Sequence, residues 1–315
     1  MEQELSKERT LFKAIIDKIP VLLTRYDPDT NMLYLNKEFE KIVGWKTEEI
    51  KDIDLMEKVY PDPDYRKQAM EYMQKASTEW REFQVQSKSG KIINSEWSNI
   101  RLDDGTQVGI GIDITERKQA EERLKRTMDA TIDTMSKIIE AKDPYTSNHQ
   151  HRVCQLAVPL ARELGLPEDK VEGIRIASLI HDIGKIGLPT EILSKPGKLS
   201  DIEFSLIKDH SQIGYDILKS IDFTYPVAQI VLQYHERLNG SGYPNNVKGD
   251  KILLEAKILG VADVVEAMSS FRSYRPALGI DAALEEIIQN KGTLYDPEVV
   301  DACLKLFKEK GFKFE

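Results

Sequence analysis

Apolar and polar residues alternate along the first third of the chain in a pattern that changes from helical to extended. Apolar residues between Leu5 and Ile19 recur on one helical face, and Pro20 ends that pattern. Two short apolar segments, 21–26 and 32–36, follow with turn residues between them, which predicts a hairpin. Three further strand-like segments are separated by turn residues: 80–87, 92–102 and 108–114. The last alternates at period two, as half-buried strands do, and the whole region predicts a small α+β domain over residues 1–115.

A polar, helix-forming segment separates this region from the second half. Residues 116–141 contain no glycine or proline and are rich in Glu, Lys, Arg and Ala. Five apolar or small residues within it step by four and three, the spacing of a two-stranded coiled coil: Leu124, Met128, Thr131, Met135 and Ile138. One interpretation is a signalling helix that pairs two subunits and transmits a twist or register change. The alternative is a helix whose apolar stripe packs on its own chain.

The second half, residues 142–315, shows no strand pattern and predicts a helical bundle. Leu166-Pro167-Glu168 begins one helix with a proline at its first position. Ser200-Asp201-Ile202-Glu203 is a capping box, and we expect the helix that it begins to continue through His210 to Ile217. Asp296-Pro297-Glu298 begins another helix, whose apolar stripe includes Cys303.

Composition narrows the class of protein. The 315 residues suffice for two domains at roughly 150 residues each. The chain has 44 Lys and Arg against 53 Asp and Glu, a net charge of −9, which argues against binding to duplex nucleic acid or to an acidic membrane surface. No apolar run approaches the roughly 18 residues of a membrane span, and two cysteines cannot form a disulfide framework. These features predict a cytoplasmic protein.

Histidines are confined to the second half, where they accompany carboxylates. All five follow residue 148, so the first half offers no imidazole for haem and no cysteine for a flavin adduct. His181-Asp182 ends an apolar helix, and Asp263 lies within an aliphatic run, where a buried carboxylate must be paired, protonated or bound to a metal. Taken singly, each histidine reads as a hydrogen-bonded core residue, and Asp263 reads as a helix cap. Their joint occurrence on one helical domain favours a metal site for Fe, Mn or Zn.

The first half resembles a PAS sensor domain. The resemblance rests on Asn36 opening a helix, Gly44-Trp45 after it, Tyr60-Pro61-Asp62, the Lys88–Lys91 turn and, most specifically, Asp113-Ile114-Thr115-Glu116-Arg117. It implies a sheet-lined cup that binds a small ligand of unknown identity, with a dimerisation scaffold as the alternative.

The second half resembles HD-GYP domains, with the family's motifs in their usual order. These motifs are Asp143–His149, His181–Gly187, Lys195–Leu199, Ile207–His210, His235–Arg237, Gly240–Pro244, Val261–Asp263 and Arg272–Arg275. The resemblance implies a phosphodiesterase that converts cyclic di-GMP to pGpG or GMP, with a metal-bridging hydroxide attacking phosphorus in line. It also implies two divalent ions, iron or manganese first, with zinc, magnesium or nickel as alternatives.

The resemblance assigns roles to particular residues of this chain. The first metal would be held by His149, His181, Asp182 and Asp263, and the second by Asp182, His210 and His235. Asp182 and Lys185 are the catalytic candidates, and the substrate-binding candidates are Lys185, Gly242, Tyr243, Pro244, Arg272 and Arg275. We expect His151 to face solvent, because it lies two residues from His149 on the same helix.

Four positions depart from the family pattern, and they keep a second function open. Tyr234 stands where the family has a histidine ligand of the second metal, so that this ion would lose one ligand to water. Tyr145 replaces the acid of three-metal members, Asn239 an aspartate and Ser273 a proline. The leading hypothesis is a PAS-regulated cyclic di-GMP phosphodiesterase, homodimeric through its N-terminal and linker helices. One alternative is a catalytically weak or inactive adaptor that binds cyclic di-GMP or a diguanylate cyclase partner. The other is an enzyme for another cyclic dinucleotide or nucleotide phosphate.

Overall fold

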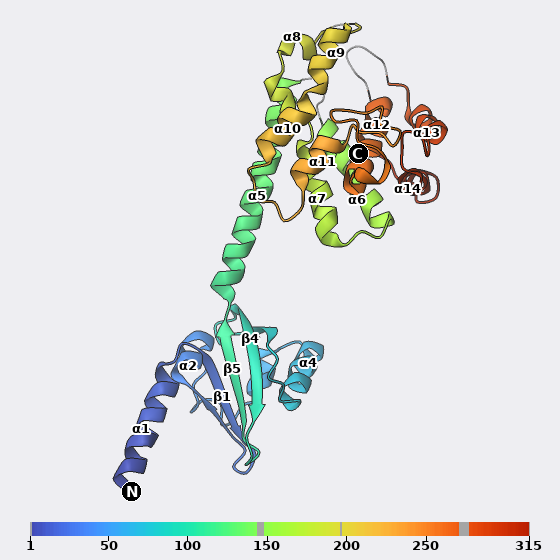
Figure 1. Cartoon of the computed structure of the whole chain (residues 1–315). Helices are drawn as coiled ribbons and strands as arrows, with labels where there is room; N and C mark the ends of the chain where they lie inside the picture. The colour runs from blue at the N-terminus through green and yellow to red at the C-terminus, as the bar shows by residue number, and fades with distance from the viewer. Residues whose placement is uncertain (1, 144–147, 196, 271–276, 315) are drawn as a thin grey trace. The chain divides into compact units, whose positions relative to one another are not determined.

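The computed structural model describes residues 2–143, 148–195, 197–270 and 277–314. The chain divides into two compact units, Met1–Arg126 and Thr127–Glu315, each with its own hydrophobic core (Figure 1). Within the described part of the chain, no helix has both the length and the apolar character to cross a membrane.

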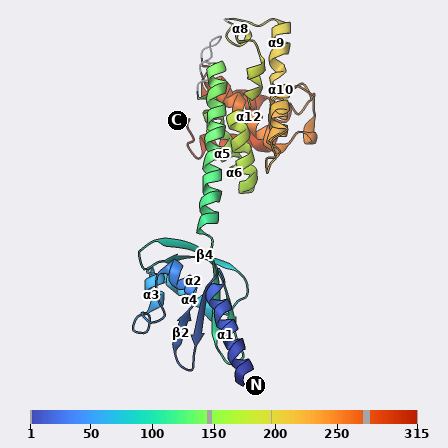
Figure 2. The same cartoon turned by 90° about the vertical axis from the view of Figure 1, so that its left-hand side faces the viewer.

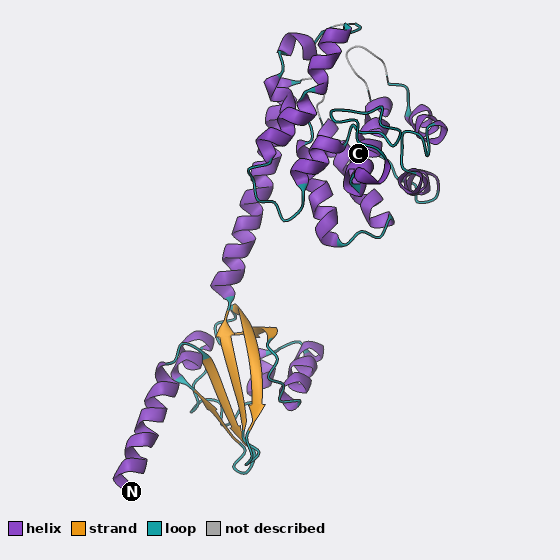
Figure 3. Cartoon of the chain, viewed as in Figure 1, coloured by secondary structure: helices purple, strands orange, loops and turns teal. Residues whose placement is uncertain are grey.

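The N-terminal unit is built on one antiparallel sheet, whose strands are orange in Figure 3. The sheet has five strands in the order β2-β1-β5-β4-β3. Its helices α2, α3 and α4 share a core with one face of that sheet (Figure 2). The predicted hairpin and the three later strands are all present. The elements are α1 (Glu2–Lys18), β1 (Leu22–Asp27), β2 (Met32–Leu35), α2 (Lys37–Val43), α3 (Leu55–Val59), α4 (Pro63–Gln74), β3 (Arg81–Gln86), β4 (Ile92–Arg101) and β5 (Gln107–Asp113).

The buried face of β5 carries its glycines, and its isoleucines lie on the more exposed face. Gly109 and Gly111 are buried, whereas Ile110 is partly exposed and Ile112 is 38% exposed. A Cβ atom at Gly111 would lie 2.7 Å from the ring of Trp97, so the indole occupies the space of a side chain there. The period-two pattern therefore identified the strand correctly, and within it the two glycines face the core.

The same inner face borders a cavity of about 410 Å³, a size typical of small-molecule sites. Among the described residues, its lining contains no charged side chain and includes the polar sheet residues Thr24, Asn99 and Gln107. The Nδ2 atom of Asn99 is buried and has no hydrogen-bond partner among the described residues. The lining of this cavity is therefore largely apolar.

The helix α5 (Thr115–Lys142) is continuous through the predicted linker, but its coiled-coil positions mostly do not pack on the chain. Ile132, Ser136 and Ile139 are the buried residues of its second half. Leu124 is 72% exposed, Met128 43% and Ile138 50%, and Met135 alone of the five heptad positions packs partly against the C-terminal core. The apolar stripe and the packed face are thus two different faces of α5.

The C-terminal unit is helical throughout its described residues, as predicted. Ser200 forms both hydrogen bonds of the expected capping box with Glu203. The single helix expected from there to Ile217 is wrong, because the chain turns at Asp209 and His210 begins a new helix. The elements after α5 are α6 (His149–Glu163), α7 (Glu168–Ile180), η2 (Ile183–Gly187), α8 (Thr190–Leu193), α9 (Asp201–Lys208), α10 (His210–Leu218), α11 (Val227–Gln233), η3 (Gly249–Lys251), α12 (Leu254–Ser269), α13 (Ile280–Gln289) and α14 (Pro297–Lys308).

Candidate metal centre

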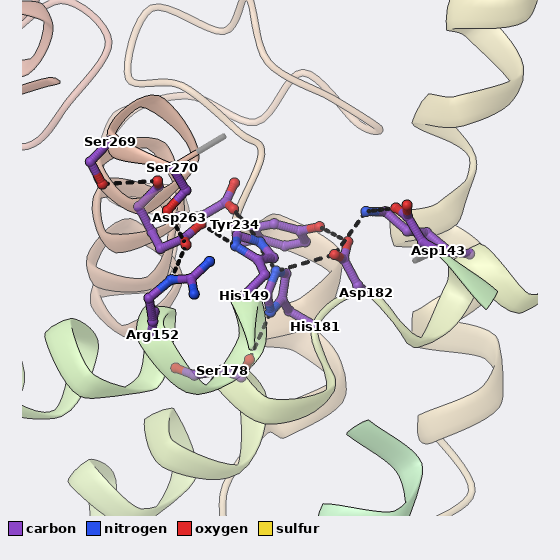
Figure 4. A network of polar contacts seen from close by, with 12 residues as sticks. Asp143, His149, Arg152, Ser178, His181, Asp182, Tyr234, Asp263, Ser269 and Ser270 are labelled. Atoms are coloured by element: carbon purple, nitrogen blue, oxygen red, sulfur yellow. Dashed lines mark hydrogen bonds and ion pairs between the residues drawn. The ribbon is translucent and has the colours of Figure 1, made fainter. Parts of the chain in front are cut away.

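At the end of α7, the imidazole of His181 and the carboxylate of Asp182 lie in the core of the C-terminal unit. His181 caps the helix, and its Nδ1 donates to the carbonyl of Ser178 at 2.8 Å (Figure 4). That bond leaves Nε2 as the nitrogen with the lone pair. Nε2 is buried and has no hydrogen-bond partner among the described residues, and it lies 3.6 Å from Oδ2 of Asp182. A buried lone pair without a donor is what a bound cation would satisfy.

Two further helices bring their ligands to the same point. His149 begins α6, and its Nε2 lies 3.1 Å from Oδ1 of Asp263 on α12. The same carboxylate oxygen lies 3.9 Å from Nε2 of His181. His149, His181 and Asp182 each offer one ligand atom within 4.8 Å of the others, and all three are buried. This donor set of imidazole and carboxylate fits a divalent cation such as Fe, Mn or Zn.

A second carboxylate on α12 orients His149, and sequence reasoning missed it. Glu266 is fully buried and makes a short hydrogen bond to Nδ1 of His149. It also accepts hydrogen bonds from Nε of Arg152 at 2.6 Å and from Oγ of Ser270 at 2.7 Å. An acid that binds the far nitrogen of an imidazole fixes its tautomer, so that Nε2 keeps its lone pair. The available signal was a second acid three residues after Asp263 in the same apolar helix.

Burial and charge keep these groups in the protonation states that a cation needs. Burial lowers the pKa of His181 and of His210, so both imidazoles are neutral near pH 7. Burial opposes the charged form of Asp182, but Lys185 and the nearby imidazoles outweigh it and hold its pKa well below the ordinary value. The neighbouring imidazoles, His149 foremost, likewise outweigh burial at Asp263 and lower its pKa.

Lys185 lies on the short helix η2 directly beside this cluster. Its Nζ is 2.8 Å from Oδ2 of Asp182 and 3.1 Å from Oδ2 of Asp143, the residue that follows α5. The ammonium is mostly buried, with 12% of the side chain exposed. Its two carboxylate contacts fix a positive charge at the edge of the candidate metal site.

The residues expected to hold a second ion also converge, but a phenol lies among them. Nε2 of His210 is 3.8 Å from Oδ1 of Asp182, and the ring of His235 is 5.2 Å from the ring of His210. The hydroxyl of Tyr234 lies 2.6 Å from Nε2 of His210 and 3.4 Å from Oδ1 of Asp182. Tyr234 is 1% exposed, and burial raises its pKa well above the ordinary value, so the phenol is neutral.

The loop at 240–244 lies against the same residues. The ring of Tyr243 packs on His235 with centroids 4.5 Å apart. Position 242 requires glycine because the backbone of His235 packs closely against it. A Cβ atom there would lie 2.4 Å from the carbonyl oxygen of His235. Glu236 anchors the chain after this loop by accepting backbone hydrogen bonds from Asn245 and Val247.

The structure describes most of the residues that the sequence singled out. His151 is 42% exposed at its side chain and lies 3.5 Å from Asp133, so it faces away from the cluster as expected. Arg272, Arg275, Ser273 and Tyr145 lie outside the described residues.

Comparison with known families agrees with both halves of the chain. A model described as HD domain matches residues 133–299, more than half of the chain. The chain belongs to the HD domain family. A second model, described as PAS fold, matches residues 10–114. The predicted order, a PAS domain followed by an HD domain, and the predicted fold class are therefore confirmed.

Three curated relatives of the HD domain carry informative names. The chain is 42% identical over 177 residues to a cyclic di-GMP phosphodiesterase response regulator, RpfG, of Xanthomonas campestris, covering 56% of this chain and 47% of that one. It is 41% identical over 182 residues to a cyclic di-GMP phosphodiesterase of Thermotoga maritima, covering 56% and 49%. It is 37% identical over 178 residues to the 3'3'-cGAMP-specific phosphodiesterase 3 of Vibrio cholerae, covering 56% and 39%. The chain thus spans about half the length of the first two of these relatives, and less of the third.

Proposed function

We propose that this protein is a metal-dependent phosphodiesterase that hydrolyses a cyclic dinucleotide, with cyclic di-GMP as the first candidate. The observation that carries the proposal is the buried meeting of His149, His181, Asp182 and Asp263 from separate segments of one domain. The names of the relatives agree with this chemistry. Hydrolysis would add water across one P–O bond of the ring to give pGpG, and a second hydrolysis would give GMP.

The four residues of this cluster are proposed to hold a divalent cation, and their mixed imidazole and carboxylate donors suit iron, manganese or zinc. Such a cation, when bound, supplies Lewis acidity at the phosphate. Glu266 orients His149 through Nδ1, and the Ser178 carbonyl orients His181 in the same way. The protein therefore presents preformed ligands with fixed tautomers.

Lys185 is proposed to stabilise the charge that develops on the phosphate. Its ammonium is held between Asp143 and Asp182 and is shielded from water, where a fixed charge acts more strongly than in bulk solvent. Tyr243 and Pro244 belong to the loop beside His235, and we propose that they contact the substrate.

Control of this site by the PAS domain is proposed from the course of α5. At its first residue, the Thr115 hydroxyl accepts a hydrogen bond from the backbone N–H of Asn94 in the sheet, at 2.9 Å. At its other end, Asp143 contacts Lys185. One continuous helix thus joins the sheet of the sensor to the lysine beside the metal ligands, which gives a ligand in the cavity a physical route to the site.

A homodimer is proposed because apolar side chains of two helices are left uncovered. Leu11 and Phe12 on α1 are 60% and 65% exposed, and Leu124 on α5 is 72% exposed. Exposed apolar stripes at helical spacing are typical of surfaces that pair with another helix.

The test compares two histidine variants of the full chain. His181→Ala removes a cluster ligand and is expected to abolish hydrolysis of cyclic di-GMP, whereas His151→Ala removes a half-exposed histidine and is expected to leave it unchanged. Hydrolysis by His181→Ala at the rate of the parent protein would contradict the proposal. Parallel reactions with cyclic di-GMP and 3'3'-cGAMP decide the substrate, because the relatives include enzymes named for each.

A further inference from the structure

We infer that the Tyr234 hydroxyl occupies the place of the second cation, so that this protein holds one divalent cation per chain in place of two. The inference deepens the proposed function and rests on its choice of ligands. It also replaces the expectation that water fills the vacant ligand position, because the phenol itself lies between His210 and Asp182.

The first argument concerns the lone pair of His210. Nδ1 of His210 lies 2.6 Å from the carbonyl oxygen of Ile207, which can only accept, so Nδ1 carries the proton. Nε2 therefore has the lone pair, and the Tyr234 hydroxyl at 2.6 Å donates into it. A cation at His210 would have to displace this buried hydrogen bond and leave the phenol proton without its acceptor.

The second argument concerns the space around the hydroxyl. The oxygen of Tyr234 is also 3.4 Å from Oδ1 of Asp182, the carboxylate that the two positions were expected to share. The ring of Tyr234 packs against His235 with centroids 3.9 Å apart and meets the edge of the His181 ring at 5.1 Å. A side chain held by ring contacts with two candidate ligands cannot withdraw without disturbing both.

Close packing of its backbone against α12 also fixes the position of Tyr234. The carbonyl oxygen of Tyr234 would lie 2.5 Å from a Cβ atom at Gly260, so only glycine on α12 allows the backbone of Tyr234 to approach so closely. Tyr234 is among the largest fully buried side chains of the protein. The phenol is therefore held in a fixed position within the site.

The first position has the opposite character. Nε2 of His181 is buried without a hydrogen-bond partner among the described residues, and Nε2 of His149 faces a carboxylate oxygen of Asp263. Within the described ranges no hydroxyl hydrogen-bonds to Nε2 of His181, so this set retains a lone pair that a cation could use. The contrast between an open His181 and an occupied His210 distinguishes the two positions.

The experiment measures metal content and the electronic signature of the metal, apart from activity. The full-length protein is stripped with a chelator, reloaded anaerobically with Mn²⁺, and passed through a desalting column before elemental analysis. We expect about one tightly bound Mn²⁺ per chain and the electron paramagnetic resonance spectrum of an isolated ion, because only one position is free. Tyr234→His is expected to bind about two ions and to show the spectrum of an exchange-coupled pair, because it supplies a ligand in place of the phenol.

Two more variants keep the inference testable if Tyr234→His does not fold. Tyr234→Phe keeps the ring and removes the donor to His210, so it is expected to gain a second, weaker ion at high Mn²⁺ concentration. His210→Ala is expected to keep the single ion of the parent protein. Two coupled ions in the parent protein, or none, would overturn the inference, as would loss of the single ion in His210→Ala. One ion without hydrolysis of any cyclic dinucleotide would support the inference while removing the proposed phosphodiesterase activity.

Discussion

Replacing Glu266 with glutamine tests whether the buried acid behind His149 sets the affinity for the cation. The carboxylate accepts hydrogen bonds from three donors, which are Nδ1 of His149, Nε of Arg152 and Oγ of Ser270. Glutamine has nearly the same shape but carries one oxygen and one NH₂ group, so it cannot accept on both sides. In Glu266→Gln, the NH₂ group of the glutamine therefore faces either Nδ1 of His149 or Nε of Arg152, and both of these are donors.

The cost depends on which donor loses its partner. If the NH₂ group faces His149, Nδ1 must accept, the proton moves to Nε2, and the nitrogen that points at Asp263 can no longer bind a metal. If the NH₂ group faces Arg152, a mostly buried guanidinium loses its carboxylate partner, while His149 keeps a weaker, neutral one. Loss of such an orienting group weakens metal binding by about 10- to 100-fold, or about 1.4 to 2.7 kcal/mol.

The assay is a competition titration of Mn²⁺ against a chelator of known affinity, and nitrogen-15 chemical shifts of the imidazole report the tautomer of His149. The matched control is Glu255→Gln, because Glu255 is also a buried acid on α12 but pairs with Lys170 at 3.1 Å. We expect the control to bind Mn²⁺ like the parent protein. Unchanged affinity and an unchanged tautomer in Glu266→Gln would refute the orienting role.

Three other variants probe the proposed catalytic role of Lys185, the proposed dimer and the sheet of the PAS domain. Asp143→Asn replaces a charged partner of Lys185 with a neutral one and is expected to lower kcat about tenfold with little change in metal content, as steady-state kinetics with elemental analysis will show. Leu124→Glu combined with Met128→Glu places charges on the exposed stripe of α5, and sedimentation analysis is expected to show monomers; a persistent dimer would exclude this stripe as the interface. Gly111→Ala drives a Cβ atom into the buried indole of the sheet and is expected to lower the stability of the PAS domain by about 1 to 3 kcal/mol in urea unfolding, whereas an unaffected midpoint would show that the indole can move.

Local sequence signals predicted the elements of the fold well, because caps and turns act over a few residues. The capping box at Ser200 and the Asp296 cap are both present where the pattern placed them. The break at Asp209 was missed because Ile207, His210 and Ile213 keep a helical spacing across it. Such spacing indicates which residues lie on the same side of the helical segment. It does not show whether the segment is one helix or two.

The inner face of β5 could not be predicted from its own residues. Hydrophobicity marks Ile110 as inward, but the space beside Gly111 is filled by the indole of Trp97, which comes from β4. Which face a strand buries depends on what a neighbouring strand supplies, and that is a tertiary property.

The sequence motifs contain the candidate metal ligands, but they did not indicate the residues that support those ligands. His149, His181, Asp182 and Asp263 stand in the motifs and converge in the structure. Glu266 was missed because its role depends on a contact across 117 positions of sequence. The sequence drew attention to Tyr234 as a departure, but only the geometry shows that its hydroxyl lies between two expected ligands.

The most direct test of the central claim is the rate of cyclic di-GMP hydrolysis by the full-length protein as Mn²⁺ is added back to the chelated form. The account predicts no turnover without metal and a rate that rises in proportion to the bound Mn²⁺, with pGpG or GMP as the product. Turnover that is independent of metal, or no turnover of any cyclic dinucleotide once the metal is fully bound, would contradict it.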